Sequence, residues 1–203
     1  MSLNSSAKAG LIKTKKLYRI KYRLMDKLSM DDLNRKTVDE FKSAEKFPVV
    51  VVLDNVRSMH NVGSVFRTAD GFLLEAIYLC GYTPKPPHRD IQKTALGATE
   101  TVHWEAFETT MDAVKILQQQ GYKLLAVEQA KQSIMLHQIN YSANEKLAII
   151  FGNEVEGVQQ EIIDRCDACI EIPQFGMKHS LNVSVAAGIV LYKIIEQQLK
   201  TKK

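Results

Sequence analysis

Two side chains that could help to hold an anion, Asn61 and Arg67, stand six residues apart in the polar segment from Leu53 to Asp70 of this 203-residue chain. An asparagine at the start of a helix can cap it and leave backbone N–H groups free for an anion. The arginine offers a planar guanidinium that suits a phosphate or a carboxylate. The same residues would equally suit an ordinary capped helix with Arg67 in a structural ion pair.

A second polar segment, Gly152–Gly157, has two glycines five residues apart, as a phosphate-binding loop does. Val158 and Gln159 follow where such a loop needs Lys and Ser or Thr, so we do not expect a Walker-type nucleotide site. Glu154 comes soon after an apolar run, where a carboxylate suits a cation, a hydroxyl or an amine as its partner. A tight turn with a solvated carboxylate accounts for these six residues equally well.

In the third segment, Ile170–Gly188, the polar residues Ser180, Asn182 and Ser184 alternate with apolar ones, and small residues follow. Small residues allow close backbone packing beside a binding site. The alternative is that Ser180 or Asn182 begins a helix and has no other role.

Other chemistries find less support in the sequence. Cys166 and Cys169 form a C-x-x-C pair, but a second pair that would complete a zinc site is missing from the sequence, and we predict no metal. The pair is expected at the end of a helix, whereas a thioredoxin-like pair lies at a helix start. We therefore expect buried or half-buried thiols. The motifs of dinucleotide-binding proteins and of serine hydrolases are also absent from the sequence.

The elements that must position these segments alternate between strand and helix. Strands are predicted over Pro48–Leu53, Ala76–Leu79, Tyr122–Val127, Leu147–Phe151 and Cys169–Ile172. Helices are predicted over Asp31–Glu45 (with Asp31 as N-cap), Asn61–Phe72, Thr110–Gln120, Val158–Cys166 and Leu181–Leu199. This alternation indicates an α/β protein with a largely parallel sheet. In such sheets ligands bind beyond the carboxyl ends of the strands, which is where all three polar segments begin.

The composition is that of an ordinary globular protein. Hydrophobic residues make up 45% and charged residues 25%, which excludes a wholly disordered chain. With ten Gly, five Pro and three Cys, the chain is neither collagen-like nor a disulfide scaffold. The longest apolar runs are too short to span a bilayer, and Met1–Gly10 lacks the apolar core of a signal peptide. We therefore expect a cytoplasmic protein without a membrane segment.

Basic residues are concentrated at the N-terminus. Residues 1–46 contain twelve Lys and Arg against six Asp and Glu, a net charge of +6, whereas residues 47–203 have a net charge of −2. Tyrosines are interleaved with the cations, a pattern that suits stacking on bases and contacts to phosphates. The residues expected to contact a nucleic acid are Lys15, Lys16, Arg19 and Arg23. The alternative is a solvated helix whose apolar face packs on the rest of the protein.

Taken together and in this order, the three segments resemble the SpoU/TrmH family of RNA ribose 2′-O-methyltransferases, which belongs to the SPOUT superfamily. The matching motifs are Asn61-x5-Arg67-Thr68-Ala69-Asp70, Phe151-Gly152-x-Glu154-x-x-Gly157, and Ile172-Pro173-x3-Gly176-x3-Ser180-Leu181-Asn182-Val183-Ser184-Val185-Ala186. The resemblance covers residues 47–198, and the basic N-terminal arm is matched only in character.

This resemblance implies a SPOUT-type fold, in which a largely parallel sheet ends in a C-terminal trefoil knot. It implies a methyltransferase domain over residues 47–203, preceded by a basic helical extension over residues 1–46. It also implies S-adenosylmethionine as the cofactor, RNA as the partner, and a homodimer. The apolar residues of the last helix, Val183, Val185, Val190, Leu191, Ile194 and Ile195, would serve the knot and the dimer interface, or would equally fit a buried helix.

The resemblance also implies roles for individual residues. Asn61, Arg67, Glu154, Ser180 and Asn182 would line the catalytic site, and Gln129, Gly152, Ile172, Pro173 and Leu181 would hold the cofactor. Arg67 would activate the ribose hydroxyl. Because a neutral arginine is costly, we favour a charged Arg67 that clamps a phosphate and stabilises the developing alkoxide. His60 is an alternative base.

The residues leave the RNA substrate open. The 46 residues before the first strand are too few for the ribosomal-protein-like domain that some rRNA-modifying relatives carry. We therefore expect tRNA more than rRNA, with a D-loop guanosine as the leading target and the wobble nucleotide next. Three other classes remain as alternatives: a catalytically silent RNA-binding protein on the same fold, a SPOUT enzyme that methylates a base nitrogen, and a redox or metal protein.

Overall fold

The computed structural model describes residues 26–29, 31–33, 35–142, 144–178 and 180–201. The chain divides into two compact units, residues 1–36 and 37–203, and each is described by itself. In the first unit, a short 3-10 helix η1 (Asp31–Leu33) follows Ser29, whose backbone N and Oγ donate to Asp32 Oδ2 at 2.9 and 2.5 Å. Four residues expected to contact RNA lie outside the described residues: Lys15, Lys16, Arg19 and Arg23.

The single helix predicted over Asp31–Glu45, capped by Asp31, is wrong. The described residues form η1 and a separate helix α2 (Val38–Ser43), whose N-cap is Thr37. Thr37 Oγ1 accepts a hydrogen bond from the Glu40 N–H at 3.2 Å, and Glu40 Oε2 accepts one from the Thr37 N–H at 2.7 Å. This reciprocal pair is a capping box, which begins a new helix at Thr37. Phe41 anchors α2 in the core of the second unit.

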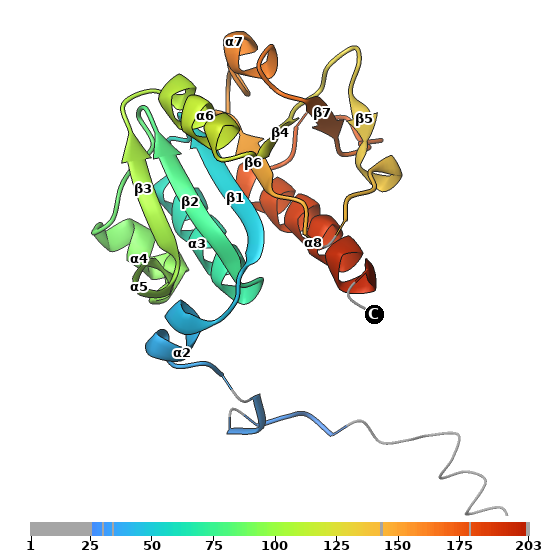
Figure 1. Cartoon of the computed structure of the whole chain (residues 1–203). Helices are drawn as coiled ribbons and strands as arrows, with labels where there is room; N and C mark the ends of the chain where they lie inside the picture. Colours follow the sequence, from blue (N-terminus) through green and yellow to red (C-terminus); the bar gives the residue numbers. More distant parts are fainter. Residues whose placement is uncertain (1–25, 30, 34, 143, 179, 202–203) are drawn as a thin grey trace, which may run out of the picture. The chain divides into compact units, whose positions relative to one another are not determined.

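A seven-stranded sheet forms the centre of the second unit, and all its strand pairs are parallel. The strands are β1 (Phe47–Asp54), β2 (Leu74–Cys80), β3 (His103–Phe107), β4 (Lys123–Val127), β5 (Ile134–Met135), β6 (Leu147–Phe151) and β7 (Ala168–Glu171). Their order in the sheet is β3-β2-β1-β6-β4-β7-β5 (Figure 1). The predicted α/β class with a parallel sheet is confirmed.

The central strand β1 is buried on both faces, which explains its unbroken run of valines. Val49, Val51 and Leu53 belong to one hydrophobic cluster, and the alternate residues Val50 and Val52 belong to a second. Side chains of a strand point alternately to its two faces, so each face of β1 contributes to a different core.

Helices cover both faces of the sheet (Figure 1). The first cluster packs beneath α3 (Met59–Gly71), α4 (Arg89–Ala95), α5 (Ala98–Thr101) and α8 (Val183–Thr201). The second cluster packs beneath α6 (Thr110–Gln119) and α7 (Gln160–Ile163). The chain places β2 and β3 on one side of β1 and the later strands on its other side, so the strand order reverses beside β1. This is the position where open α/β sheets bind ligands.

Some elements were not predicted or differ in length. The sequence analysis missed α4, α5, β3 and β5; in β3 three of five residues are exposed, so the strand lacks the apolar run on which the prediction relied. The helix predicted over Val158–Cys166 is wrong in length, since α7 spans only Gln160–Ile163. The N–H groups of Val158 and Gln159, in the loop before α7, donate to the carboxylates of Glu128 and Asp54.

The last helix, α8, has a buried face and an exposed apolar stripe. Most of the apolar residues expected in the knot and dimer interface are buried in the protein's own core, but Val185 is 50% exposed. The exposed stripe consists of Val185, Ile189, Tyr192 and Leu199. Among the described residues, no helix is both long and apolar enough to cross a membrane.

Candidate active site

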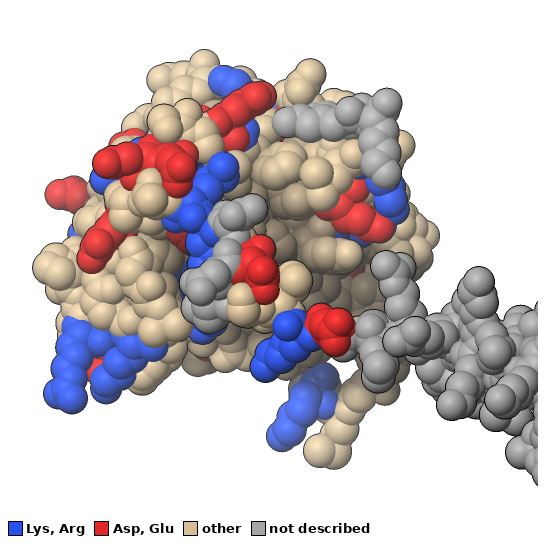
Figure 2. All heavy atoms as spheres, turned by 90° about the horizontal axis from the view of Figure 1, so that it is seen from below, with Lys and Arg blue, Asp and Glu red and all other residues tan. Residues whose placement is uncertain are grey.

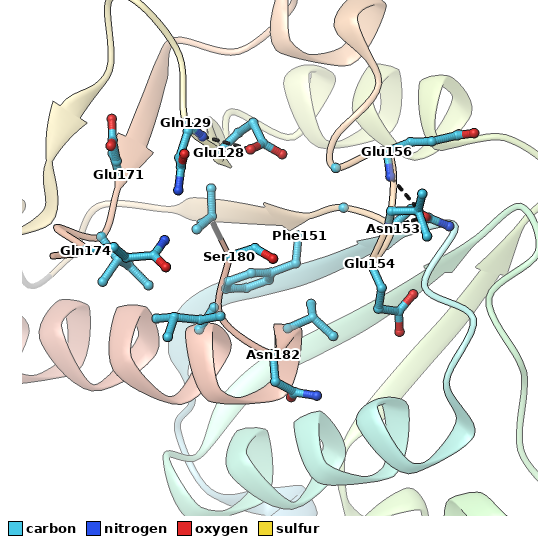
Figure 3. Close-up of a pocket in the computed structure, with 18 of the residues that line it drawn as sticks. Glu128, Gln129, Phe151, Asn153, Glu154, Glu156, Glu171, Gln174, Ser180 and Asn182 are labelled. Carbon is cyan, nitrogen blue, oxygen red and sulfur yellow. Dashed lines mark hydrogen bonds between the residues drawn. The ribbon is translucent and has the colours of Figure 1, made fainter. Parts of the chain in front are cut away.

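A pocket of about 510 Å³ lies at the carboxyl ends of β4, β6 and β7 (Figure 3). Its walls come from the loops that follow these three strands and from the start of α8. Glu128 and Gln129 line one side of the pocket, and Asn182 lies on the opposite side, beside the start of the helix. The volume falls within the roughly 300–1,000 Å³ that small-molecule sites occupy.

The lining of this pocket is apolar and acidic. Its aliphatic and aromatic walls include Val127, Phe151, Ile170, Ile172 and Val183. Its carboxylates are Glu128, Glu154, Glu156 and Glu171, and no Lys or Arg is among the described residues that line it. Opposite charges attract more strongly in a pocket partly shielded from water, so this lining favours a ligand that is apolar in part and positively charged in part.

The loop between Gly152 and Gly157 closes tightly on itself. Asn153 and Gly157 exchange backbone hydrogen bonds of 3.0 and 2.9 Å, and Asn153 Oδ1 accepts bonds from the N–H groups of Val155 and Glu156. A Cβ on Gly152 would lie 2.0 Å from the backbone carbon of Gly157, and Gly157 has a φ of +70°. Both glycines are therefore required by the geometry of this loop.

Glu128 fixes the end of this loop from the neighbouring strand. Its Oε2 accepts a hydrogen bond from the Val158 N–H at 3.1 Å, and its Oε1 accepts one from the Gln129 N–H at 2.8 Å. The sequence analysis missed Glu128, although it follows a buried strand directly. The sequence analysis also missed Glu171, which ends β7 and lines the pocket.

Glu154 joins this loop to the start of α3. Its carboxylate accepts hydrogen bonds from the N–H groups of Arg57 at 3.1 Å and Ser58 at 3.2 Å, and from Asn61 Nδ2 at 2.9 Å. Burial, the largest single influence, raises the pKa of Glu154, but these hydrogen bonds together lower it below its usual value of 4.5. Glu154 is therefore a carboxylate held by three donors, although the residue itself remains exposed to solvent.

Asn61 connects Glu154 to the third polar segment. The expectation that Asn61 caps the helix is wrong, because the N-cap of α3 is Ser58, whose Oγ accepts the Asn61 N–H at 3.3 Å. The buried Asn61 side chain instead accepts a hydrogen bond from Asn182 Nδ2 at 3.0 Å. Asn182 Oδ1 in turn accepts bonds from Ser184 N at 2.9 Å and Oγ at 2.6 Å. One chain of hydrogen bonds thus links all three polar segments.

The structure brings most of the predicted site residues to one pocket. Those that line it are Gln129, Gly152, Glu154, Ile172, Ser180, Leu181 and Asn182. Asn61 is attached to the pocket through Glu154 and Asn182, and Pro173 is not among the lining residues. Arg67 is exposed on α3, outside the lining, and its side chain has no hydrogen bond or ion pair within the described part of the chain. A structural ion pair at Arg67 is therefore not seen there.

The cysteines are free, and they are buried or half-buried as expected. Burial raises the pKa of the Cys80 and Cys166 thiols to about 12. Cys169 donates its thiol to the carbonyl oxygen of Glu128 at 3.3 Å. Across the described residues, no group of three or more His, Cys, Asp or Glu side chains could hold a metal ion.

The pocket suits S-adenosylmethionine, which has a flat aromatic adenine and a net positive charge, since its sulfonium and ammonium groups outweigh its single carboxylate. The carboxylates of the lining complement that charge, and the apolar walls around Phe151 can enclose a ring. The absence of Lys and Arg from the described lining disfavours RNA phosphate inside the pocket, so RNA would approach from outside it.

Comparison with known proteins gives a consistent result. Residues 48–192 match the sequence model of the SpoU rRNA Methylase family. The chain is 31% identical over 170 residues to the 23S rRNA (guanosine-2′-O-)-methyltransferase RlmB of Vibrio parahaemolyticus, covering 84% of this chain and 68% of the relative. It is 32% identical over 154 residues to the tRNA (guanosine(18)-2′-O)-methyltransferase of Aquifex aeolicus, covering 74% and 70% of the two chains.

Solved structures agree. The A. aeolicus TrmH/SpoU tRNA modifying enzyme superposes with a TM-score of 0.72 at 26% identity, covering 81% of this chain and 82% of that one. The AdoMet-bound rRNA methyltransferase of Sinorhizobium meliloti superposes with a TM-score of 0.68 at 27% identity, covering 73% and 56%. The chain therefore belongs to the SpoU rRNA methylase family of S-adenosylmethionine-dependent RNA 2′-O-methyltransferases.

Proposed function

We propose that this protein methylates the ribose 2′-hydroxyl of a guanosine in tRNA, with a D-loop guanosine as the leading target. The observation that carries the proposal is the hydrogen-bond chain through Glu154, Asn61 and Asn182. This chain fixes the acidic pocket against α3, the helix that carries Arg67. A cofactor in the pocket and a ribose beside α3 would then be held in a fixed relation, as an in-line transfer requires.

Within this proposal, S-adenosylmethionine supplies a methyl group already activated by its sulfonium. Arg67 remains charged, binds the phosphate next to the target ribose and stabilises the negative charge that develops on the 2′-oxygen. The 2′-hydroxyl proton passes to the RNA phosphate or to water. His60, exposed in the first turn of α3, is the alternative proton acceptor.

The cofactor would be held mainly by the backbone. We assign backbone contacts with the cofactor to Gln129, Gly152, Ile172 and Leu181. All four residues line the pocket. Pro173 would shape the loop that follows β7. The carboxylates of the lining would attract the positively charged groups of the cofactor, and Ser180 would face the reacting atoms.

The relatives support two RNA substrates. The A. aeolicus relative is named as a tRNA guanosine-18 enzyme, which supports the D-loop. The V. parahaemolyticus relative is named as a 23S rRNA enzyme and supports rRNA as the second candidate. We prefer tRNA because the A. aeolicus tRNA modifying enzyme superposes with a TM-score of 0.72, against 0.68 for the S. meliloti rRNA methyltransferase.

A homodimer formed through α8 is part of the proposal. The stripe consists of Val185, Ile189, Tyr192 and Leu199, which are spaced four, three and seven residues apart. Residues at this spacing lie on one face of a helix. Contiguous exposed apolar surface of this kind suits a second copy of the chain. The buried residues of α8, such as Val190 and Ile194, would contribute to the fold and not to the interface.

The remaining features of the proposal concern the fold and the arm. The segment between β7 and α8 would form a C-terminal trefoil knot around the cofactor. Residues 47–203 would be the methyltransferase domain, and the basic arm over residues 1–46 would bind the body of the tRNA. The named relatives are bacterial RNA-modifying enzymes, which supports a cytoplasmic location.

The test is the transfer of tritium from labelled S-adenosylmethionine to unmodified tRNA and, separately, to rRNA. We expect label in tRNA that survives alkali as a resistant dinucleotide, because a 2′-O-methyl group blocks cleavage of the adjoining phosphodiester. Arg67→Ala should abolish transfer, whereas Arg165→Ala, which removes an exposed arginine beyond α7, should not. Label in rRNA alone would select the second candidate. Cofactor binding without transfer to either RNA would indicate a silent RNA-binding protein.

A further inference from the structure

Four exposed side chains stand around the loop that follows β2. They are Arg57, Tyr82, Lys85 and Arg89, and we call them the rim residues. Tyr82 is 86% exposed, which is unusual for a large aromatic side chain. Within the described part of the chain, none of the four side chains has a hydrogen bond, an ion pair or a ring contact.

Asn55 attaches Tyr82 to the cofactor pocket. The backbone oxygen of Asn55 accepts a hydrogen bond from Nδ2 of the pocket residue Asn153 at 2.8 Å. Its side-chain Oδ1 accepts one from the Tyr82 N–H at 3.0 Å. Gly81 makes this approach possible, because a Cβ at that position would lie 2.2 Å from Asn55 Oδ1. Only Asn55 therefore separates the backbone of Tyr82 from the pocket loop.

Two threonines hold the rest of the segment beside α3. Thr83 Oγ1 donates to the Leu53 carbonyl oxygen at 3.0 Å and accepts the Val56 N–H at 3.1 Å. Thr94 Oγ1 donates to the carbonyl oxygen of His60 at 3.0 Å. The loop after β2 and the helix α4 are thus attached at both ends to the segment that begins α3 and, further along, presents Arg67.

The charge of this segment is locally positive. Residues 47–203 carry a net charge of −2, and basic and acidic side chains are interspersed on the face shown in Figure 2. Overall charge therefore does not attract RNA to this part of the chain. Between Gly81 and Ala95 the sequence has Lys85, Arg89 and Lys93 against a single acid, Asp90, which pairs with Lys93 at 2.6 Å.

We propose that the rim residues bind the RNA nucleotides adjoining the methylated one, with Tyr82 stacked on an unpaired base and the cations on the neighbouring phosphates. The inference rests on the proposed function for the presence of a target nucleotide beside α3. The partner is a loop of RNA and not a duplex, because only unpaired bases present a face to an aromatic side chain. The rim would hold the strand in register while Arg67 contacts the target.

The decisive experiment measures RNA binding and turnover separately. We expect the double variant Lys85→Glu/Arg89→Glu to raise the Kd and the KM for tRNA at least tenfold. The slope of log Kd against log salt should fall by about 0.7–0.9 for each phosphate that the variant no longer neutralises. The affinity for S-adenosylmethionine should stay within about twofold, because neither residue lines the pocket. Tyr82→Ala should weaken tRNA binding about tenfold, and Tyr82→Phe should restore it, because the phenyl ring still stacks.

A matched control makes the same change of charge on the other layer of helices. Lys115→Glu/Arg165→Glu alters one exposed cation on α6 and one beyond α7, so its tRNA affinity should remain near that of the wild type. Equal losses of affinity in the two double variants, or none in the rim variant, would overturn the proposal. Rim-dependent tRNA binding by a wild-type protein that methylates no RNA would support the rim and refute the proposed function. Normal methylation by a protein whose tRNA binding does not depend on the rim residues would support the proposed function and refute the role of the rim.

Discussion

The side chain of Asn182 donates a hydrogen bond of 3.0 Å to the side-chain oxygen of Asn61, which lies 121 residues earlier in the chain. The orientation of both amides follows from Glu154. A carboxylate can only accept, so Asn61 must turn its NH₂ group toward Glu154 and its oxygen toward Asn182. Asn182 then turns its own oxygen to the N–H of Ser184, in the first turn of α8. The negative charge on Glu154 thus sets which group donates and which accepts in each hydrogen bond from Glu154 to Ser184.

Asn61→Asp should break this chain. The variant keeps the size of the side chain but places a second carboxylate beside Glu154 and removes the NH₂ donor. Like charges this close repel, and the Glu154 carboxylate loses one of its three donors. We expect the affinity for S-adenosylmethionine, measured by calorimetry, to fall at least tenfold. Asn61→Ser, which adds no charge, should have a smaller effect, and equal effects of the two variants would contradict the argument.

Glu154 should make the stability of the protein depend on pH. Because its pKa is lowered in the folded state, its contribution is fully present above the ordinary glutamate value of 4.5 and is lost as pH falls through the folded pKa. We expect Glu154→Gln to lower the free energy of unfolding by about 0.5–1.5 kcal/mol at pH 7, because water partly screens this exposed carboxylate. The difference from the wild type should shrink between pH 5 and pH 3.

Urea denaturation at several pH values measures this difference. Glu156→Gln is a suitable control, because Glu156 lies two residues further along the same loop with an exposed side chain. That variant should unfold at the same urea concentration as the wild type at pH 7, because the Glu156 side chain makes no hydrogen bond or ion pair within the described residues. A constant gap between wild type and Glu154→Gln from pH 7 to pH 3 would show that the carboxylate acts through packing and not through its charge.

The sequence predicts an element well when the element's own residues mark it, and poorly when distant residues decide its ends. The valine run of β1 identified a strand buried on both faces, because a short run of β-branched residues favours a strand over a buried helix. The edge strand β3 was missed because its residues are mostly exposed and carry no such run. Helix ends were misjudged where distant groups decide them, as at Val158, whose N–H is held by Glu128.

The site was predictable in its residues but not in its connections. Spacing and resemblance selected Asn61, Glu154 and Asn182, and the structure joins them in one chain of hydrogen bonds. Their bonding could not be read from the sequence, since each asparagine would equally suit a helix cap. Glu128 was missed because a lone carboxylate after a strand is common, and its role depends on the loop that packs against it.

Gly152→Ala should destabilise the pocket loop. The added Cβ would lie 2.0 Å from the Gly157 backbone carbon and 2.1 Å from the Val158 nitrogen, and backbone atoms in a closed loop cannot move aside cheaply. We expect a loss of about 1–3 kcal/mol, a fall in Tm of about 3–10 °C, and weak cofactor binding. Gly71→Ala is the control, because nothing lies within 4 Å of its Cβ, and its Tm should stay near that of the wild type.

The thiols should react slowly in the folded protein. Burial raises the pKa of Cys80 and Cys166 to about 12, so almost none of either thiol is ionised at pH 8, and the thiolate is the reactive form. We expect an aromatic disulfide reagent to label these two cysteines at least 100-fold more slowly in the native protein than in urea, with mass spectrometry to assign the sites. Rapid labelling of Cys166 without denaturant would contradict its burial.

Arg67→Lys separates a bidentate guanidinium from a simple positive charge. A lysine keeps the charge but offers a single ammonium, which cannot bind a phosphate through two parallel N–H groups. We expect kcat to fall about 10- to 100-fold with tRNA, with no change in cofactor affinity, because Arg67 does not line the pocket. Single-turnover methylation at saturating tRNA from pH 6 to pH 9 measures the effect. Near-full activity across that range would exclude a bidentate role and return His60 to consideration as the base.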